Sequence, residues 1–470
     1  MEEEPPSSRI EQGRKILKII PLMHTNLAMS ASEEKGRKRA SVRTMGCRLN
    51  QSEGIALEGK LREAGYEVVP FGEPAELGVI NTCTVTNEAD AKSRNAIRRF
   101  SKQNPTATTV VVGCYSQISA NEVAMVDGVD YVIGNHDKLN FLNYLSEEKP
   151  DSPVVVRERI DREDFSIGLV GEAKFEQRAN LKIQDGCDFM CSFCIIPFAR
   201  GRARSRDWED LLTDAKEMIG KGVRELVLTG VNLGTYQSGG RDFLGMIEGL
   251  SELPGLDRLR ISSIEPTTIP EQLFCLMADK DHPLMPFLHV PMQAGCDSTL
   301  IRMKRRYNLG EMDAFFKRAT FAVPDLCVGT DLMVGFPGES KADFEETCAT
   351  FLEGPFAYCH VFTYSERNGT LAAKSIDQVD MEERRRRSAH LRRLSASKRM
   401  DFHDHYNGKE MRVLLENPKE GSYFAYSENY LKVRVPEKPT GLANRVAIVR
   451  IGQAFPEYCL ADLLDWEGRE

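Results

Sequence analysis

The hydrophobic pattern from Arg43 onward alternates short apolar runs with amphipathic stretches. The runs SVRTMGC, LGVINTCTV and TTVVVGCYSQ predict strands that lead to Cys47, Cys83 and Cys114. The stretches between them, QSEGIALEGKLREAGYEV and NEADAKSRNAIRRFSKQN, predict helices. A further strand (VDYVIGN) and helix follow. Strands separated by helices predict a parallel sheet covered by helices, with ligands beyond the carboxyl ends of its strands.

A second alternating series spans residues 180–375. Its apolar runs predict six strands, namely NLKIQDG, ELVLTGVN, RLRISSIEP, FLHVPMQ, CVGTDLMVGFP and YCHVFTYS. Amphipathic stretches such as WEDLLTDAKEMIGKG separate these runs, which predicts a partial (βα)6 barrel or an open parallel sheet, because a full barrel needs eight units. A basic helix and hinge follow at 381–408. Short alternating strands with Gly and Pro turns then predict a small all-β barrel at the end.

These patterns predict an α/β multidomain protein, as the length of 470 residues also favours. The polar start, rich in Glu, Lys, Arg and Ser, predicts disorder. The expected segments are a disordered leader at 1–40, an N-terminal parallel α/β domain at 41–150, a charged linker at 151–178, a central barrel domain at 179–403 and the β barrel at 404–470.

Charge and cysteine content narrow the class of protein. The net charge is -8, so a nucleic-acid partner would have to be held by a local basic patch. The twelve cysteines do not suggest a short, disulfide-rich secreted framework. We find no stretch that would span a membrane, and the apolar segment Ile16–Ala31 is too interrupted for a signal peptide. We therefore expect a cytoplasmic protein with reduced thiols.

Three cysteines form the motif C-x3-C-x2-C at Cys187, Cys191 and Cys194. Thiolates at this spacing can converge on one soft metal site. A closed zinc site needs four ligands, and the next cysteine is Cys275. Three thiolates on a cubic iron–sulfur cluster leave one iron open for a substrate. A zinc site with a distant fourth ligand, or chance clustering, would also explain the motif.

Cys47, Cys83 and Cys114 share the same end of consecutive predicted strands. Buried cysteines that only fill a core would explain any one of them. Three at one sheet edge also fit a second metal site. The remaining cysteines are expected in the core or on the surface, whereas His289 and His360, which fall in strand patterns, are expected in the core.

The motif, with Phe193 just before its last cysteine and a partial parallel barrel around it, resembles the radical S-adenosylmethionine (SAM) superfamily. The segments TMGCRLNQSE, INTCTVTNEADAKSR and VVVGCYSQ resemble the N-terminal domain of the methylthiotransferases within it. The C-terminal segment resembles the TRAM domain, an RNA-binding barrel. The resemblance implies two [4Fe–4S] clusters, one on Cys187, Cys191 and Cys194 that binds SAM, and one on Cys47, Cys83 and Cys114.

Further site residues follow from the resemblance. The SAM-binding candidates are Phe193, Gly230, Asn232, Glu265 and Asp331. The RNA-binding candidates, which are basic or aromatic and suit phosphates and bases, are Arg200, Arg202, Arg204, Arg206, Tyr430, Lys432 and Arg434. Turn glycines, helix caps and solvated strand faces would equally explain several of them.

The segment NTCTVTNEADAKSR and the loop GCDFMCSFCIIPFARGRARSR resemble the branch that acts on N6-threonylcarbamoyladenosine beside the tRNA anticodon. The implied activity is radical SAM-dependent methylthiolation of carbon 2 of that nucleoside at position 37. The alternatives are isopentenyladenosine in tRNA and an aspartate of a ribosomal protein. Arg48-Leu49 and Ser52 depart from the branch pattern. The implied partners are the tRNA anticodon stem-loop, a low-potential electron donor and a sulfur source.

Overall fold

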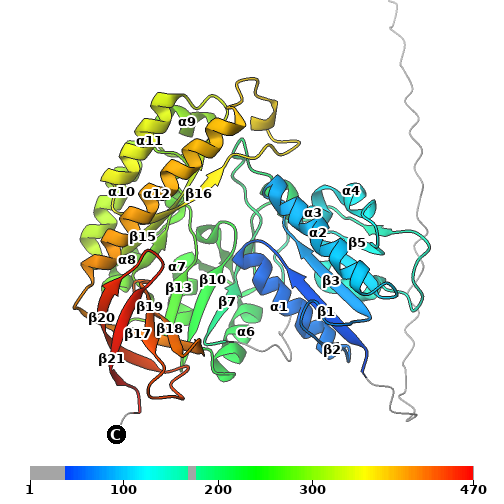
Figure 1. Ribbon diagram of the computed structural model, residues 1–470, viewed down its shortest axis with the longest axis horizontal. Helices are drawn as coiled ribbons and strands as arrows, with labels where there is room; N and C mark the ends of the chain where they lie inside the picture. Colours follow the sequence, from blue (N-terminus) through cyan, green and yellow to red (C-terminus); the bar gives the residue numbers. More distant parts are fainter. Residues whose placement is uncertain (1–36, 168–175, 469–470) are drawn as a thin grey trace, which may run out of the picture. The chain divides into compact units, whose positions relative to one another are not determined.

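In the computed structural model, the N-terminal part of the chain forms a sheet of six parallel strands. Helices cover the faces of this sheet (Figure 1). The strand order is β2-β1-β3-β4-β5-β6. Its elements are β1 (Arg39–Thr44), α1 (Arg48–Glu63), β2 (Glu67–Val68), β3 (Leu77–Thr82), α2 (Asn87–Gln103), β4 (Thr108–Gly113), α3 (Cys114–Ile118), α4 (Ala120–Ala124), β5 (Tyr131–Ile133), η1 (Lys138–Tyr144) and β6 (Val154–Val156). Strands β3 and β4 are almost wholly buried, as expected for central strands covered on both faces.

Helix α2 shows how the sequence sets an element's limits. The Thr86 side chain accepts a hydrogen bond from the Ala89 backbone N–H at 3.1 Å and so caps the first turn. Ile97 and Phe100 bury one face of the helix against the sheet. The helix ends before Pro105, which cannot continue it.

The structure describes residues 37–167 and 176–468, so most of the leader expected at 1–40 and part of the expected linker lie outside the described residues. Strand β1 begins at Arg39, so the end of the expected leader is ordered strand. Val154–Val156 forms edge strand β6, in parallel with β5, where we expected an irregular linker. Three consecutive valines are too short a run to stand out among charged neighbours.

The central part contains the six predicted parallel strands, in two three-stranded sheets with orders β13-β10-β7 and β14-β15-β16. Its main elements are β7 (Arg178–Lys182), β8 (Gln184–Asp185), α5 (Ile196–Arg200), β9 (Arg204–Ser205), α6 (Trp208–Gly220), β10 (Glu225–Thr229), α7 (Phe243–Ser251), β13 (Arg258–Ile261), α8 (Gln272–Ala278), β14 (Phe287–His289), α9 (Asp297–Arg302), α10 (Leu309–Ala322), β15 (Cys327–Val334), α11 (Lys341–Glu353) and β16 (Phe356–Thr363). Short elements between them are η2 (Leu233–Thr235), β11 (Gln237–Ser238), β12 (Arg241–Asp242), η3 (Pro266–Thr268) and η4 (Ala372–Lys374). A bridge joins Leu259 of β13 to Leu284, in the segment just before β14.

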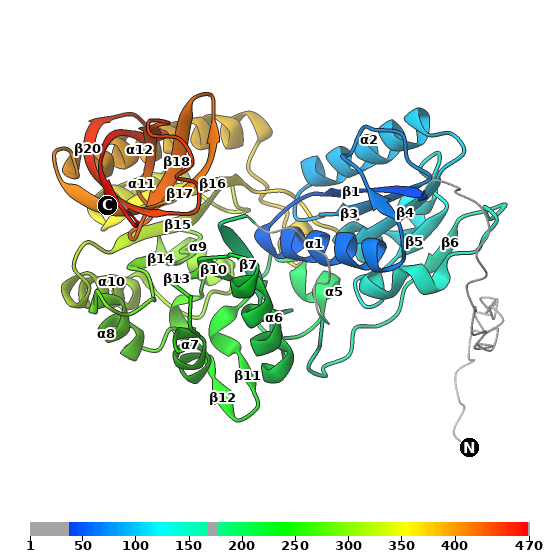
Figure 2. The same cartoon turned by 90° about the horizontal axis from the view of Figure 1, so that it is seen from below.

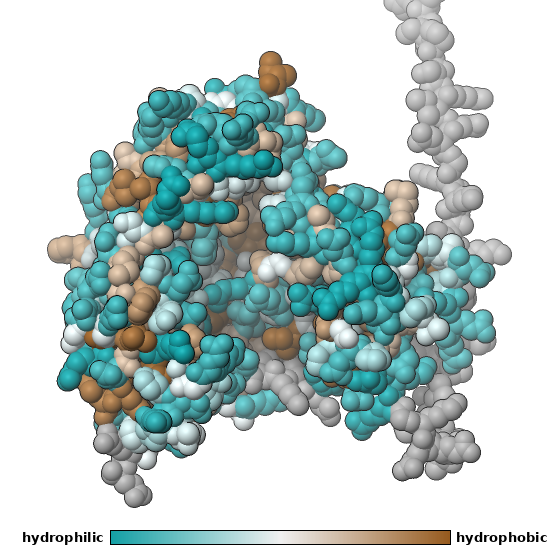
Figure 3. All heavy atoms as spheres, in the orientation of Figure 1, coloured by the Kyte–Doolittle hydropathy of each residue, from teal (hydrophilic) through white to brown (hydrophobic). Residues whose placement is uncertain are grey.

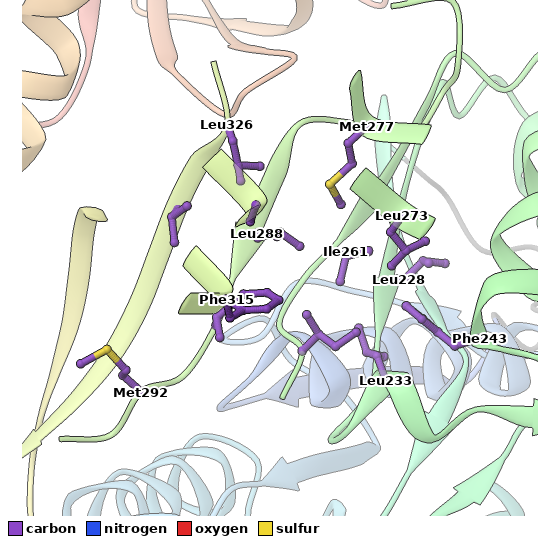
Figure 4. Close-up of a cluster of buried hydrophobic side chains, with 14 of the residues drawn as sticks. Leu228, Leu233, Phe243, Ile261, Leu273, Met277, Leu288, Met292, Phe315 and Leu326 are labelled. Atoms are coloured by element: carbon purple, nitrogen blue, oxygen red, sulfur yellow. The ribbon is translucent and has the colours of Figure 1, made fainter. Parts of the chain in front are cut away.

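One hydrophobic core fills the space between these sheets and their helices (Figure 4). Leu228 and Ile261 come from strands, whereas Phe243, Leu273 and Phe315 come from the covering helices. The side chains of Leu228, Ile261 and Phe243 are no more than 1% exposed. Burial of such side chains stabilises each by about 1.5–3 kcal/mol, so this core fixes the strand ends from which the site residues project.

The chain ends in a long helix and a closed barrel. Helix α12 (Met381–His405) runs beside β16, where the Cys359 backbone N–H donates to the Ser395 hydroxyl at 2.9 Å. The barrel strands are β17 (Glu410–Lys419), β18 (Ser422–Ser427), β19 (Lys432–Pro436), β20 (Val446–Ala454) and β21 (Cys459–Trp466), closed in the order β17-β18-β19-β21-β20. Figure 2 shows these strands curling into a ring beside α12. The predicted all-β barrel is therefore confirmed.

Side chains of β13 tie this barrel to the central sheet. Arg258 donates to the Tyr426 carbonyl at 2.8 Å, and Arg260 donates to the Glu428 carbonyl at 2.9 Å. The described chain from Lys38 onward accordingly forms one compact unit. Among the described residues, no helix has both the length and the apolar character needed to cross a membrane.

Candidate functional site

Three cysteines gather at the carboxyl edge of the N-terminal sheet. Cys47 follows β1, Cys83 follows β3 and Cys114 follows β4, and these three strands are neighbours. Cys47 also occupies the N-cap of α1, where the partial positive charge of the helix end favours a thiolate. Gly46 has a φ of +93°, and a Cβ there would lie 2.9 Å from the Cys83 sulfur. Only glycine lets the chain approach this sulfur so closely.

The environment of these sulfurs fits a metal centre. Burial raises the pKa of the Cys83 thiol to about 12, although the Val85 backbone N–H opposes the rise. Repulsion from Cys114 and Cys47, which follow neighbouring strands at the same edge, adds to it. The Asn135 side-chain amide donates to the Cys114 sulfur at 3.5 Å. Thiolates this close need a cation to hold them, and soft iron or zinc centres supply one.

The second cysteine set lies in the loop between β8 and α5. The Cys187 sulfur accepts the Phe189 backbone N–H at 3.3 Å, and the Cys191 sulfur accepts an Arg305 N–H at 3.2 Å. Burial raises the pKa of Cys187 to about 11 and that of Cys194 to about 12, and the neighbouring cysteines add to both shifts. These three free thiols therefore also form a partly buried donor set that suits a soft metal centre.

Arg305 connects this loop to Glu265, one of the SAM candidates. The same guanidinium that donates to the Cys191 sulfur also forms an ion pair with the Glu265 carboxylate. Glu265 is therefore next to the loop cysteines, as its predicted role requires.

The other SAM candidates lie in different surroundings. Asn232 is fully buried, and its Oδ1 accepts from the Thr268 hydroxyl at 3.1 Å, while its Nδ2 finds no partner among the described residues. A buried amide without a partner fits a polar ligand. Phe193 instead packs edge-on against Phe336, with ring centroids 6.2 Å apart. Gly230 and Asp331 line the cavity described next, and all of these roles stay predictions.

A cavity of about 560 Å³ opens between the N-terminal sheet, the central strands and the C-terminal barrel. In Figure 3 the molecular surface is hollowed between these regions, with apolar atoms on its floor. Cys47 and Arg48 contribute to the lining from the N-terminal side and Tyr430 from the barrel side. Asp331 accepts from His289 at 2.8 Å and from His360 at 3.2 Å. Residues far apart in sequence thus form one aromatic, polar chamber beside Cys47.

Sequence reasoning missed several lining residues. His360 was expected in the core but its side chain is 55% exposed, and it lies on the same face of β16 as Tyr358. Arg48 and Arg399 also line the cavity. The alternation of Tyr358 and His360 along the strand was the available signal, whereas nothing in the sequence pairs Arg48 with Arg399.

The arginines after Cys194 do not form the open basic tail that we expected. Arg200 and Arg206 are each 1% exposed and bonded to carboxylates, so their predicted contact with phosphates is wrong. Arg204 is 11% exposed and lies between two aspartates. Arg202 is 38% exposed, and its RNA contact stays a prediction. The sequence shows the charges but not the acidic partners that the fold brings to them.

The predicted RNA-binding residues of the barrel lie in two places. Tyr430 stacks on Tyr426 at 4.8 Å and accepts a hydrogen bond from Arg48 at 2.6 Å, so it forms part of the cavity wall. Lys432 also lines the cavity. Arg434 is half-buried on β19 and donates to the Ser422 hydroxyl at 3.1 Å. Of these three residues, Tyr430 and Lys432 line the cavity.

Comparison with known proteins agrees with this arrangement. Residues 39–134 match the family model described as uncharacterized protein family UPF0004, and residues 181–351 match the radical SAM superfamily. A solved radical S-adenosylmethionine methyltransferase, TsrM from Kitasatospora setae, shares the fold with a TM-score of 0.54 at 14% identity, over 72% of this chain and 77% of that one. The radical SAM match implies SAM and a [4Fe–4S] cluster.

Curated relatives cover almost the whole chain. Threonylcarbamoyladenosine tRNA methylthiotransferase MtaB of Bacillus subtilis is 36% identical over 88% of this chain and 94% of its own length. MtaB of Aquifex aeolicus is 35% identical over 87% of this chain and 100% of its own length. A tRNA-2-methylthio-N(6)-dimethylallyladenosine synthase of Clostridium perfringens is 30% identical over 83% and 90%. The chain belongs to the radical SAM methylthiotransferase family.

Proposed function

We propose that this enzyme transfers a methylthio group to carbon 2 of N6-threonylcarbamoyladenosine at position 37 of tRNA, beside the anticodon. The observation that carries the proposal is the similarity to five MtaB proteins at 31–36% identity over 84–93% of the chain. The dimethylallyladenosine synthases match at 29–30% over 83%.

Two cysteine sets would hold two [4Fe–4S] clusters. Cys187, Cys191 and Cys194 would hold the one that binds SAM, and the three sheet-edge cysteines would hold the other. When bound, SAM and its cluster supply the radical that removes a hydrogen from an unreactive C–H bond, and a second SAM supplies the methyl group. Overall, the C–H bond at carbon 2 is replaced by C–S–CH3. The sulfur comes from a sulfur source, the electron from a low-potential donor, and the hydrogen leaves on 5′-deoxyadenosine.

The chain's own residues would position the reactants. Arg305 holds both Cys191 and Glu265, and so fixes the polar edge of the SAM site. The exposed rings of Phe362 and His360 in the cavity lining offer faces on which an unpaired base can stack. Arg202, Lys432 and Arg434 would contact the anticodon stem-loop.

The function is tested in cells that lack their own methylthiotransferase. Expression of this chain should convert N6-threonylcarbamoyladenosine in tRNA to its 2-methylthio form, as measured by mass spectrometry of digested nucleosides. A 2-methylthio product on isopentenyladenosine alone, or on a ribosomal protein alone, would refute the proposed substrate.

The cluster assignment is tested by iron analysis after anaerobic reconstitution. Replacing Cys187, Cys191 and Cys194 together with Ala should halve the iron and abolish 5′-deoxyadenosine formation. Cys275→Ala is the matched control, because Cys275 is an exposed free thiol, and it should change neither. Bound zinc in place of iron would refute the assignment.

A further inference from the structure

Two arginines line the cavity without an acidic partner. Arg48 lies on the first turn of α1, Arg399 lies on α12, and both side chains are half-buried. Within residues 37–167 and 176–468, the contacts of both guanidinium groups are with tyrosines rather than with carboxylates. By contrast, buried arginines such as Arg200 and Arg260 are bonded to glutamates. A half-buried cation without a counter-charge in a cavity fits an anionic ligand.

Tyrosines hold both guanidinium groups in place. Arg48 donates to the Tyr430 hydroxyl at 2.6 Å, and the Arg399 guanidinium lies 4.9 Å from the centre of the Tyr358 ring. Both arginines belong to the lining of the same cavity, together with these two tyrosines. The hydrogen bond to Tyr430 and the ring contact with Tyr358 hold the two arginine side chains in place before a ligand binds.

The acidic groups in the cavity do not neutralise these arginines. Asp331 already accepts hydrogen bonds from His289 and His360. Glu457 is exposed at the rim, on the loop before β21. The cavity therefore offers an excess of positive charge next to stacking surfaces, and a purine with a carboxylate side arm would match both.

We infer that Arg48 and Arg399 form a carboxylate subsite that recognises the threonyl carboxylate of the substrate nucleoside. This inference rests on the proposed function. Two arginines can form charge-assisted, bidentate hydrogen bonds to one carboxylate. An isopentenyl group carries no charge and would leave both guanidinium groups unpaired, so the same pair rejects it. Arg48 and Arg399 thus determine specificity between the two modified adenosines.

The experiment compares two anticodon stem-loop RNAs. One carries N6-threonylcarbamoyladenosine, and in the other the threonyl carboxylate is replaced by a primary amide of nearly the same shape. We measure kcat/KM for methylthiolation by the reconstituted wild type and by the Arg399→Gln, Arg399→Lys and Arg48→Gln variants. Arg393→Gln is the matched control, because Arg393 is exposed on the same helix.

We expect the wild type to prefer the carboxylate RNA by about 10- to 100-fold, as for hydrogen bonds to a charged group. Arg399→Gln and Arg48→Gln should remove most of this preference by lowering kcat/KM for the carboxylate RNA alone. Arg399→Lys should restore part of it, because lysine keeps the charge but not the fork of donors. Arg393→Gln should behave as the wild type.

The outcomes separate this inference from the proposed function. An unchanged preference in both Gln variants refutes the subsite while leaving the function intact. A loss of SAM affinity and of 5′-deoxyadenosine formation, at constant iron content, shows that the arginines bind the SAM carboxylate instead and also refutes it. A wild type that modifies only isopentenyladenosine RNA refutes the function, and the subsite with it.

Discussion

Glu53 is the residue whose replacement should most disturb the junction between the N-terminal sheet and the central domain. Its carboxylate is fully buried on α1. It lies 2.5 Å from the Lys138 ammonium, 2.7 Å from that of Lys182 and 3.0 Å from the Arg200 guanidinium. Asp185 supplies the second negative charge and pairs with Lys182 and Arg200. Glu53→Gln would leave one carboxylate for three buried cations.

The size of the effect follows from this loss of charge. Removing one partner from a buried ion pair costs about 3–5 kcal/mol, because the remaining charge is buried without compensation. The entropy of unfolding scales with chain length, so for this compact unit each kcal/mol lowers the thermal midpoint by about 1 °C, and the midpoint should fall by about 3–5 °C. Calorimetry of the reconstituted proteins at pH 7 measures the shift. The matched control is Glu88→Gln on the exposed pair with Lys92, which should leave the midpoint unchanged.

The pH dependence provides a second check. Burial opposes ionisation of Glu53, but Arg200, Lys138 and Lys182 hold the pKa of its carboxyl well below its usual range. The stability that this carboxylate contributes is therefore present above its unfolded pKa of about 4.3 and is lost only as the pH falls through the folded pKa. From pH 5 upward, the ionised Glu53 carboxylate should therefore contribute a constant amount to the free energy of unfolding of the wild type.

The titration of Lys138 makes the stability of the Glu53→Gln variant depend on pH above neutrality. Burial lowers the pKa of Lys138 to about 8, and Glu53 opposes this. Without Glu53 the pKa falls further, so the folded variant releases this proton at lower pH than the wild type. Because the unfolded chain still binds the proton, the stability deficit should narrow as the pH rises toward 8. A midpoint shift as small as that of Glu88→Gln, or a deficit that stays constant from pH 6 to 9, would contradict the reasoning.

Three further predictions test other parts of the structure. Glu225→Gln should also lower the thermal midpoint by several degrees, because the fully buried Glu225 carboxylate pairs with arginines at 2.8 and 2.9 Å. Gly113→Ala should reduce the iron bound by a protein that lacks the three loop cysteines, because a Cβ at φ +99° would lie 2.6 Å from the Thr82 carbonyl and displace the adjacent Cys114. Phe351→Ala should lower the free energy of unfolding in urea by about 3–5 kcal/mol, because the ring is fully buried.

The sequence predicted the parts of the fold that depend on local pattern. Apolar runs gave the strands, and the parallel topology then required Cys47, Cys83 and Cys114 to meet at one edge. The spacing of the loop cysteines likewise needed no knowledge of the fold. The valine strand β6 was missed because a three-residue edge strand has too short a pattern to be distinguished from its charged neighbours.

The sequence alone could not predict residues whose role depends on contacts with distant parts of the chain. Arg48 and Arg399 lie far apart in the sequence, and only the fold brings them to one cavity. The reverse error occurred at Arg200 and Arg206, where a run of positive charge looked like a surface for phosphates. A charge pattern alone does not distinguish a solvated face from a buried ion cluster, because the partners lie elsewhere in the sequence.

The buried charge cluster around Arg200 joins the two regions that carry the cysteine sets. Arg200 ends the short helix that follows Cys194, and it bonds to Asn50 and Glu53 on the helix whose N-cap is Cys47. Asp185, its other partner, directly precedes the loop that carries Cys187. A hydrophobic contact would tolerate sliding, whereas these directional bonds fix one relative position. The arginine expected to hold RNA therefore sets the register between the helix that follows Cys47 and the loop that carries Cys187.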